Sequence, residues 1–205
     1  MLVEPIQSDK ISHSSLLQES TIITDFGQSY VAACPPPLFK AGTIVNYASP
    51  ETRFERRAGF EADIWTLACV IFELRAGFSL FESFLGGDTE VLIQTVDTLG
   101  RLPDPWWGAF AHHSHWFEED GRPKSKRQDR LVTAHKSSIR MKLLEIGKRE
   151  GTPYPYDRSM VEKSGVRLTE EEIDLLEDLL QKMLKYIPEE RIRIQDVIRH
   201  PWFTM

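Results

Sequence analysis

A mainly α-helical domain is predicted by the sequence, because three long segments have apolar residues at helical spacing and only one short segment has the composition of a strand. Residues 61–76 are apolar on nearly every side, which predicts a helix buried on most of its surface, and Gly77 supplies its stop. Residues 88–99 and 169–184 each have one apolar stripe, so we expect two amphipathic helices packed on a common core.

Local signals mark where these helices begin and end. Asp88 or Thr89 can cap the second helix, and Gly100 fits the position after its last residue. Thr169 is followed by three glutamates, which is the start of a capping box. Pro188 ends the third helix or follows it closely, because proline cannot continue a helix.

Weaker patterns lie between and around these helices. Prolines interrupt the region of about 101–160, where only residues 138–148 have a helical pattern, so we expect an insert with one helix. A last short helix is predicted at residues 194–199. Residues 1–20 are polar and rich in serine, and we expect them to form a polar leader.

Composition narrows the class of protein. The chain has 205 residues, of which 41% are hydrophobic and 27% charged, as expected for one globular domain. Its net charge of -6 disfavours direct nucleic-acid binding, which needs a surplus of basic residues. Cys34 and Cys69 are far apart, which favours a reduced intracellular compartment, cytoplasmic or nuclear. No apolar run reaches about 20 residues and no signal peptide is present, so we expect a soluble protein without membrane contact.

Five short motifs follow one another along the chain. The β-prone run Thr21–Thr24 precedes Asp25-Phe26-Gly27, and a long loop then leads to Ala48-Ser49-Pro50-Glu51. Asp63-Ile64-Trp65 lies on the helix predicted to be buried, and Pro188-Glu189-Glu190-Arg191 follows the last long helix. Each motif alone is weak, but their order and spacing together indicate a family.

This series resembles the second half of the eukaryotic protein kinase domain, in which the Asp of a DFG motif binds Mg²⁺ and an A-P-E motif closes the activation segment. The resemblance implies that residues 21–205 form the helical C-terminal lobe of a kinase, with a short β element before the DFG turn. Leu102–Trp107, Ala62–Cys69 and the insert are similar to the fungal relatives of the SR-protein kinases, in the CMGC group.

The resemblance also implies roles for individual residues. Asp25 would bind Mg²⁺ beside ATP, Phe26 would pack against the lobe, and Gly27 would permit the turn, so these three would form the cofactor-binding residues. Glu51 would pair with Arg191 and hold the activation segment to the base of the lobe.

Two further positions have structural roles by the same resemblance. Asp63 would accept backbone hydrogen bonds that fix the catalytic loop, and Trp65 belongs to the same motif on the buried helix. Arg75, near the end of that helix, is unusual there, and a guanidinium that extends to solvent is the simplest expectation. Ile44 stands where many kinases have Ser or Thr, and Thr43 is one residue away from that position.

The catalytic machinery of a kinase is incomplete in the sequence. A catalytic loop of the form H-R-D-L-x-x-x-N normally lies roughly 15 to 20 residues before the DFG Asp. Residues 1–24 contain no Arg and no Asn, and Asp9 is their only Asp, so no general base is identifiable. The Gly-rich loop and the ATP-binding Lys of an N-terminal lobe are not found either. We therefore expect a truncated kinase domain that alone transfers no phosphate and binds Mg²⁺ and ATP weakly or not at all.

Three functions are compatible with the sequence. The chain can be part of an active serine/threonine kinase that phosphorylates proteins, including Arg/Ser-rich ones, or a catalytically dead kinase-like scaffold for protein interaction. An unrelated helical adaptor would leave the ordered motifs unexplained.

Two other polar clusters have simpler interpretations than a binding site. His112, His113 and His115 lack a ligand partner at metal spacing, and the basic segment 124–127 is typical of a solvated loop.

Overall fold

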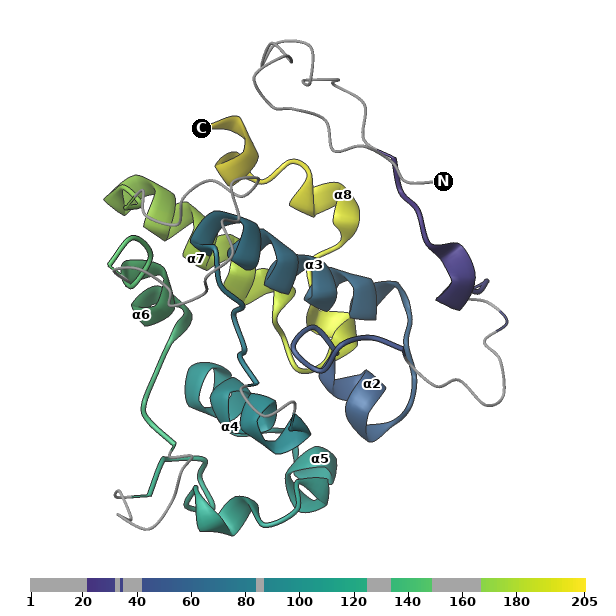
Figure 1. The fold of residues 1–205 in the computed structure, drawn as a ribbon, viewed down its shortest axis with the longest axis vertical. Coiled ribbons are helices and arrows are strands. Elements are labelled where there is room, and N and C mark those ends of the chain that lie inside the picture. The colour runs from purple at the N-terminus through teal and green to yellow at the C-terminus, as the bar shows by residue number, and fades with distance from the viewer. Residues whose placement is uncertain (1–21, 32–33, 35–41, 84–86, 125–133, 149–166) are drawn as a thin grey trace, which may run out of the picture. The chain divides into compact units, whose positions relative to one another are not determined.

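The computed structural model is mostly helical, as predicted, and has the character of the helical C-terminal lobe of the protein kinase fold (Figure 1). The chain divides into two units, Met1–Tyr30 and Val31–Met205. The structure describes residues 22–31, 34, 42–83, 87–124, 134–148 and 167–205.

Helix α3 (Phe60–Ala76) lies at the centre of the larger unit (Figure 1). Trp65 and Phe72 are 1% and 0% exposed, as expected for a helix that is apolar on nearly every side, whereas Val70 is only half-buried. The predicted stop is confirmed: Gly77 has a φ of 77°, which glycine adopts without a steric penalty.

Helix α7 (Glu170–Met183) packs against α3 and against α6 (Ile139–Leu144). Its cap is the predicted one, because the Thr169 hydroxyl accepts a hydrogen bond from the Glu172 amide at 3.1 Å. The apolar stripe of α7 is completely buried in a core shared with α3, α6 and α8 (Ile194–Val197). The chain ends in two 3₁₀ turns on either side of α8, η4 (Pro188–Glu190) and η5 (Pro201–Thr204).

A second apolar cluster lies between α4 (Asp88–Leu99) and the first part of the insert. The insert contains a helix that the sequence analysis missed, α5 (Asp104–Ala109), followed by the turn η3 (His113–His115). Prolines had indicated irregular structure there, but Pro105 lies in the first turn of α5, where the missing amide hydrogen removes no helical bond. Trp106 and Trp107 are buried in this cluster.

Three expectations for local structure were wrong in detail. Helix α6 is shorter than the predicted 138–148, because from Glu145 on the amides bond to carbonyls three residues back, in tight turns, and not four residues back as in an α-helix. Helix α8 is likewise shorter than 194–199. Residues 22–24 form no strand, because a strand needs hydrogen bonds to a neighbour and no described residue pairs with them. Within the described residues, no helix is both long and apolar enough to cross a membrane.

Candidate functional site

The first unit contains the Asp25-Phe26-Gly27 turn. Phe26 begins the 3₁₀ turn η2 (Phe26–Gln28), whose carbonyl at Phe26 accepts hydrogen bonds from the Ser29 amide at 3.0 Å and the Ser29 hydroxyl at 2.7 Å. The residue with a left-handed backbone is Asp25, at φ 63°, and not Gly27, which has room for a side chain. Aspartate tolerates this conformation better than most residues. The turn therefore depends on Asp25 more than on the glycine.

Asp25 is the only predicted metal ligand, and its carboxylate is exposed. Mg²⁺ is usually held by one or two carboxylates together with phosphate oxygens and waters, so one carboxylate at a turn fits as a single ligand. The described residues contain no group of three or more His, Cys, Asp or Glu that could hold a metal, and His112, His113 and His115 form none. The roles of Asp25, Phe26 and Gly27 stay predictions.

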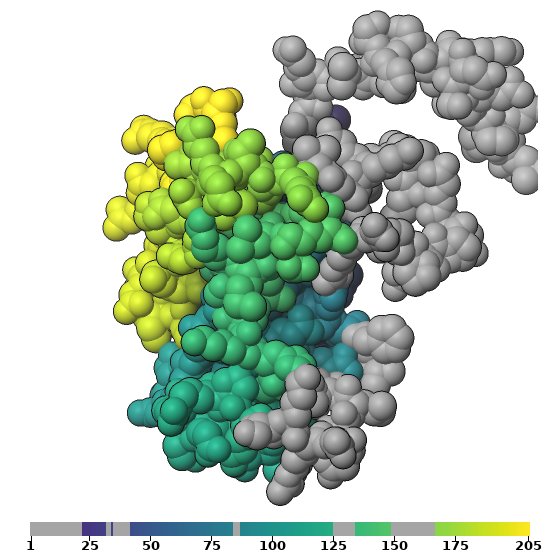
Figure 2. All heavy atoms as spheres, turned by 90° about the vertical axis from the view of Figure 1, so that its left-hand side faces the viewer, coloured from purple at the N-terminus to yellow at the C-terminus, as the bar shows by residue number. Residues whose placement is uncertain are grey.

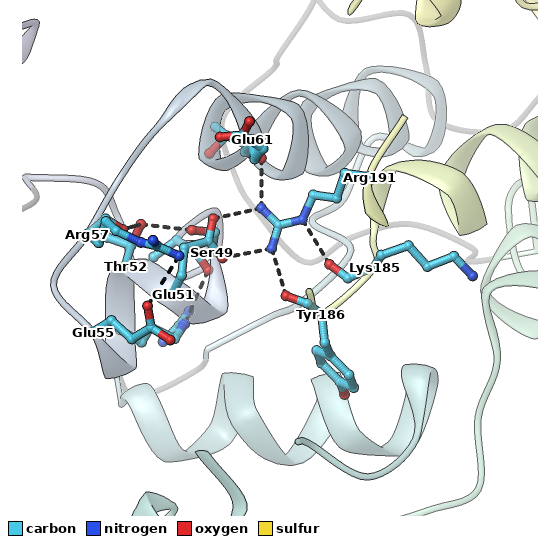
Figure 3. Close-up of polar contacts among 12 residues, drawn as sticks. Ser49, Glu51, Thr52, Glu55, Arg57, Glu61, Lys185, Tyr186 and Arg191 are labelled. Carbon is cyan, nitrogen blue, oxygen red and sulfur yellow. Dashed lines mark hydrogen bonds and ion pairs between the residues drawn. The ribbon is translucent and has the colours of Figure 1, made fainter. Parts of the chain in front are cut away.

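The larger unit contains a buried arginine whose hydrogen bonds are completely satisfied (Figure 3). Both terminal nitrogens of Arg191 donate to the carboxylate of Glu51, each at 2.7 Å. The remaining N–H groups donate to the carbonyls of Lys185 at 2.8 Å, Glu61 at 2.7 Å and Tyr186 at 3.2 Å. A guanidinium has five N–H donors, and here each has an acceptor.

Because this ion pair is buried, removing one partner should strongly lower the free energy of unfolding. The side chains of Arg191 and Glu51 are 0% and 2% exposed, and the guanidinium carbon lies 5.2 Å from the centre of the Trp65 ring. A charge left alone in such a place would lose its hydration without compensation. The structure thus brings together Glu51, Arg191 and Trp65, which the sequence analysis named as structural residues from three distant segments.

The short helix α2 (Pro50–Phe54) presents Glu51 to this site. Pro50 occupies the first turn, where its lack of an amide hydrogen is tolerated, and the hydroxyls of Ser49 and Thr52 lie 2.7 Å apart. The Thr52 hydroxyl also donates to the carbonyl of Arg57 at 3.2 Å, which closes the loop after α2 (Figure 3). These local contacts fix the backbone from which the Glu51 side chain reaches Arg191.

Arg53 is a site residue that the sequence analysis missed. It follows Glu51 by two positions, its side chain is 7% exposed, and it contacts the carbonyls of Val45 and Ala48 and the carboxylate of Asp88. Burial lowers the pKa of Arg53 to about 10, which leaves it charged at neutral pH. No local signal in the sequence pointed to Arg53, because one of its partners, Asp88, lies 35 positions away and its burial depends on tertiary packing.

Two other predicted residues have different surroundings from those expected. Asp63 is exposed in the first turn of α3, and its carboxylate has no hydrogen bond among the described residues, so its proposed role with a catalytic loop stays a prediction. Arg75 does not simply extend to solvent: it donates two hydrogen bonds to Glu172, at 2.6 and 2.9 Å, and so joins α3 to α7.

The chain belongs to the protein kinase domain family, whose model matches residues 14–203. The ordered motifs and the buried pair between Glu51 and Arg191 agree with this assignment.

Similar proteins include kinases of the CMGC type. The dual specificity protein kinase CLK1 of Homo sapiens is 25% identical over 160 residues, which cover 78% of this chain and 28% of that protein. The serine/threonine-protein kinase SKY1 of Saccharomyces cerevisiae is 26% identical over 160 residues, covering 76% and 18%. The dual specificity protein kinase CLK2 of Homo sapiens is 26% identical over 165 residues, covering 79% and 28%. The chain thus spans less than a third of each relative.

Proposed function

We propose that the chain is the helical C-terminal lobe of a serine/threonine protein kinase, formed by residues 21–205 with an insert at about 101–160. The buried pair of Glu51 and Arg191 is the observation that carries the proposal, since these residues lie 140 positions apart. The kinase resemblance accounts for their meeting, because it joins the end of the activation segment to the base of the lobe.

The reaction proposed for the intact protein is transfer of a phosphoryl group from ATP to a protein serine or threonine. Bound Mg²⁺ would neutralise charge on the phosphates, and Asp25 would supply one carboxylate to hold it. The Glu51 and Arg191 pair would hold the end of the activation segment in place. Protein substrates with Arg/Ser-rich segments are proposed on the resemblance of Leu102–Trp107, Ala62–Cys69 and the insert to the SR-protein kinases.

The chain alone is proposed to be inactive, because residues 1–24 contain no recognisable catalytic loop to provide a general base. Purified residues 1–205 should show no ATP-dependent phosphorylation of an Arg/Ser peptide, and calorimetry with Mg²⁺ and ATP should detect weak binding at most. Turnover that is abolished by Asp25→Ala would overturn this part of the proposal.

A chimera tests the kinase function directly. The N-terminal lobe and catalytic loop of SKY1 would be joined upstream of residue 21, and phosphorylation of an Arg/Ser peptide would be measured. We expect activity that requires Asp25, with Asp25→Ala inactive but equally folded. A folded chimera without activity would contradict the proposal.

The second candidate is a catalytically dead scaffold that uses the helical lobe to bind proteins. The lack of a recognisable general base before Asp25 is the observation in its favour. In that case the chain would bind a protein partner, and the chimera, which supplies a general base, would be folded but inactive because the lobe no longer positions Asp25 for Mg²⁺. Binding without turnover therefore separates the two candidates.

A further inference from the structure

Arg53 is surrounded by acceptors that come from two different segments. Its Nε donates to the carbonyl of Ala48 at 3.2 Å, and its Nη2 donates to the carbonyl of Val45. Its Nη1 pairs with the carboxylate of Asp88, the first residue of α4. The guanidinium therefore joins the segment before α2 to the start of α4.

The segment that Arg53 contacts is also held from α3. The Tyr47 amide donates to the carbonyl of Ile44 at 3.0 Å, which closes a turn over residues 44–47. The Tyr47 carbonyl accepts a hydrogen bond from the Thr66 hydroxyl at 3.1 Å, and its phenol donates to Glu73. Burial and the neighbouring Glu73 carboxylate raise the pKa of Tyr47, whose phenol is protonated at neutral pH in any case and can donate this hydrogen bond.

The outer side of the same turn is open. Ile44 is 66% exposed, although its side chain is large and apolar. Hydrogen bonds from Arg53 and Thr66 hold the backbone of the same segment. A rigid turn that presents an exposed apolar side chain is suited to contact another molecule, because little order remains to be lost on binding.

We propose that Arg53 is a positioning residue that holds the turn of residues 44–47, at the end of the activation segment, in the form that contacts the protein substrate. The inference rests on the proposed kinase function, because that function makes these residues the end of an activation segment. Arg53 acts through the carbonyls of Val45 and Ala48, and Asp88 fixes the orientation of its guanidinium.

The geometry requires arginine and not only a positive charge. Three acceptors lie around one planar guanidinium, whose N–H groups point in fixed directions, whereas a lysine ammonium is a compact charge on a flexible stem. Arg53→Lys would keep the positive charge and the attraction to Asp88. Its ammonium could not donate hydrogen bonds to the carbonyls of both Val45 and Ala48 in the geometry of the guanidinium. This conservative variant therefore separates the fork geometry from the charge.

Hydrogen exchange on the full 205-residue chain tests the positioning step. We expect Arg53→Lys to speed the exchange of amides in residues 42–49 by about tenfold, because charge-assisted hydrogen bonds to this segment are lost. Exchange in the centre of α7 should change much less. Arg75→Met is the matched control, since it removes another partly buried arginine with a carboxylate partner, and it should not act preferentially on residues 42–49.

Binding of a peptide of Arg-Ser repeats, measured by fluorescence anisotropy on the same proteins, tests the substrate step. Arg53→Lys should weaken binding several-fold, and Arg75→Met should leave it near the wild-type value. Asp88→Asn should weaken it less, because Asp88 is 54% exposed and touches only one nitrogen of the guanidinium.

Hydrogen exchange tests whether Arg53 holds the turn, and peptide binding tests whether the turn contacts a kinase substrate. The two results can therefore fail independently. Unchanged exchange in residues 42–49 for Arg53→Lys, or an equal increase for Arg75→Met, would overturn the positioning role. A wild-type chain that binds no Arg-Ser peptide would overturn the contact with that substrate, while the exchange result would still decide whether Arg53 holds the turn.

Discussion

Two arginines of the larger unit face carboxylates in very different surroundings. Arg191 has one carboxylate partner, Glu51, together with three backbone carbonyls, and its side chain is 0% exposed. Arg140 on α6 has three carboxylate partners and is 39% exposed. Those partners are Glu170 at 3.2 Å, Asp174 at 2.6 Å and Glu177 at 2.9 Å. Helices α6 and α7 lie side by side on the face of the molecule shown in Figure 2.

The number of carboxylate partners therefore does not decide how much an arginine stabilises the fold. The hydrogen bonds that Arg140 donates to Asp174 and Glu177 hold its pKa above the usual value, but arginine is charged at neutral pH in any case. Water and salt screen this exposed cluster, whereas nothing replaces a lost partner of Arg191 in its buried site.

The largest effect is expected from Arg191→Met. The change leaves the Glu51 carboxylate buried without a cation, so the free energy of unfolding should fall by about 3–5 kcal/mol. Urea denaturation of the purified chain measures it.

A double variant shows whether the loss comes from the stranded charge. Glu51→Leu with Arg191→Met should be less destabilised than the sum of the two single changes, because both buried charges are then gone. Additive effects of the two substitutions would contradict a direct interaction and would weaken the kinase-lobe assignment.

Arg75→Met should have an intermediate effect. Its two hydrogen bonds to Glu172 are only partly screened, since the side chains are 23% and 17% exposed. We expect a loss of about 1–2 kcal/mol in the same denaturation experiment, as for hydrogen bonds between charged groups. A loss as large as that of Arg191→Met would show that burial is not what separates the two pairs.

Asp97 on α4 is a partly buried carboxylate that has no arginine partner among the described residues. Burial raises the pKa of Asp97 to about 6, although the His135 amide and the charge of Lys142 act in the opposite direction. The folded chain therefore holds this proton more tightly than the unfolded chain does, and stability should fall as the pH rises through about 4 to 6.

Asp97→Asn should remove that part of the pH dependence. We expect the variant to gain stability relative to the wild type as the pH rises from 4 to 7, which thermal unfolding over this range measures. A constant difference between the two proteins at all pH values would contradict the raised pKa.

The smallest effect is expected from Arg140→Met, despite its three carboxylate partners. The thermal midpoint should change little, and the change should disappear at about 1 M salt, where the screening length is only a few Å. The control is Arg191→Met, whose loss should persist in salt. A large, salt-resistant loss for Arg140→Met would reverse the order that burial predicts.

The helical fold class and several ends of the long helices were predictable from the sequence. Gly77, Gly100 and Thr169 mark helix ends through backbone freedom or a side-chain cap, which are local properties that need no tertiary contact. The meeting of Glu51 with Arg191 was also predictable, but only through the family resemblance, since no local rule joins residues 140 positions apart.

The surroundings of the other arginines depend on tertiary contacts, which no local pattern predicts. Arg53 is buried because the turn of residues 44–47 and the start of α4 lie against α2, and Arg75 meets Glu172 because α7 packs on α3. The absent strand at residues 22–24 has the same explanation, whereas Pro105 fits the first turn of α5 by a local rule. Composition describes what a segment can form, whereas hydrogen-bond partners and burial, which come from distant parts of the chain, decide what it does form.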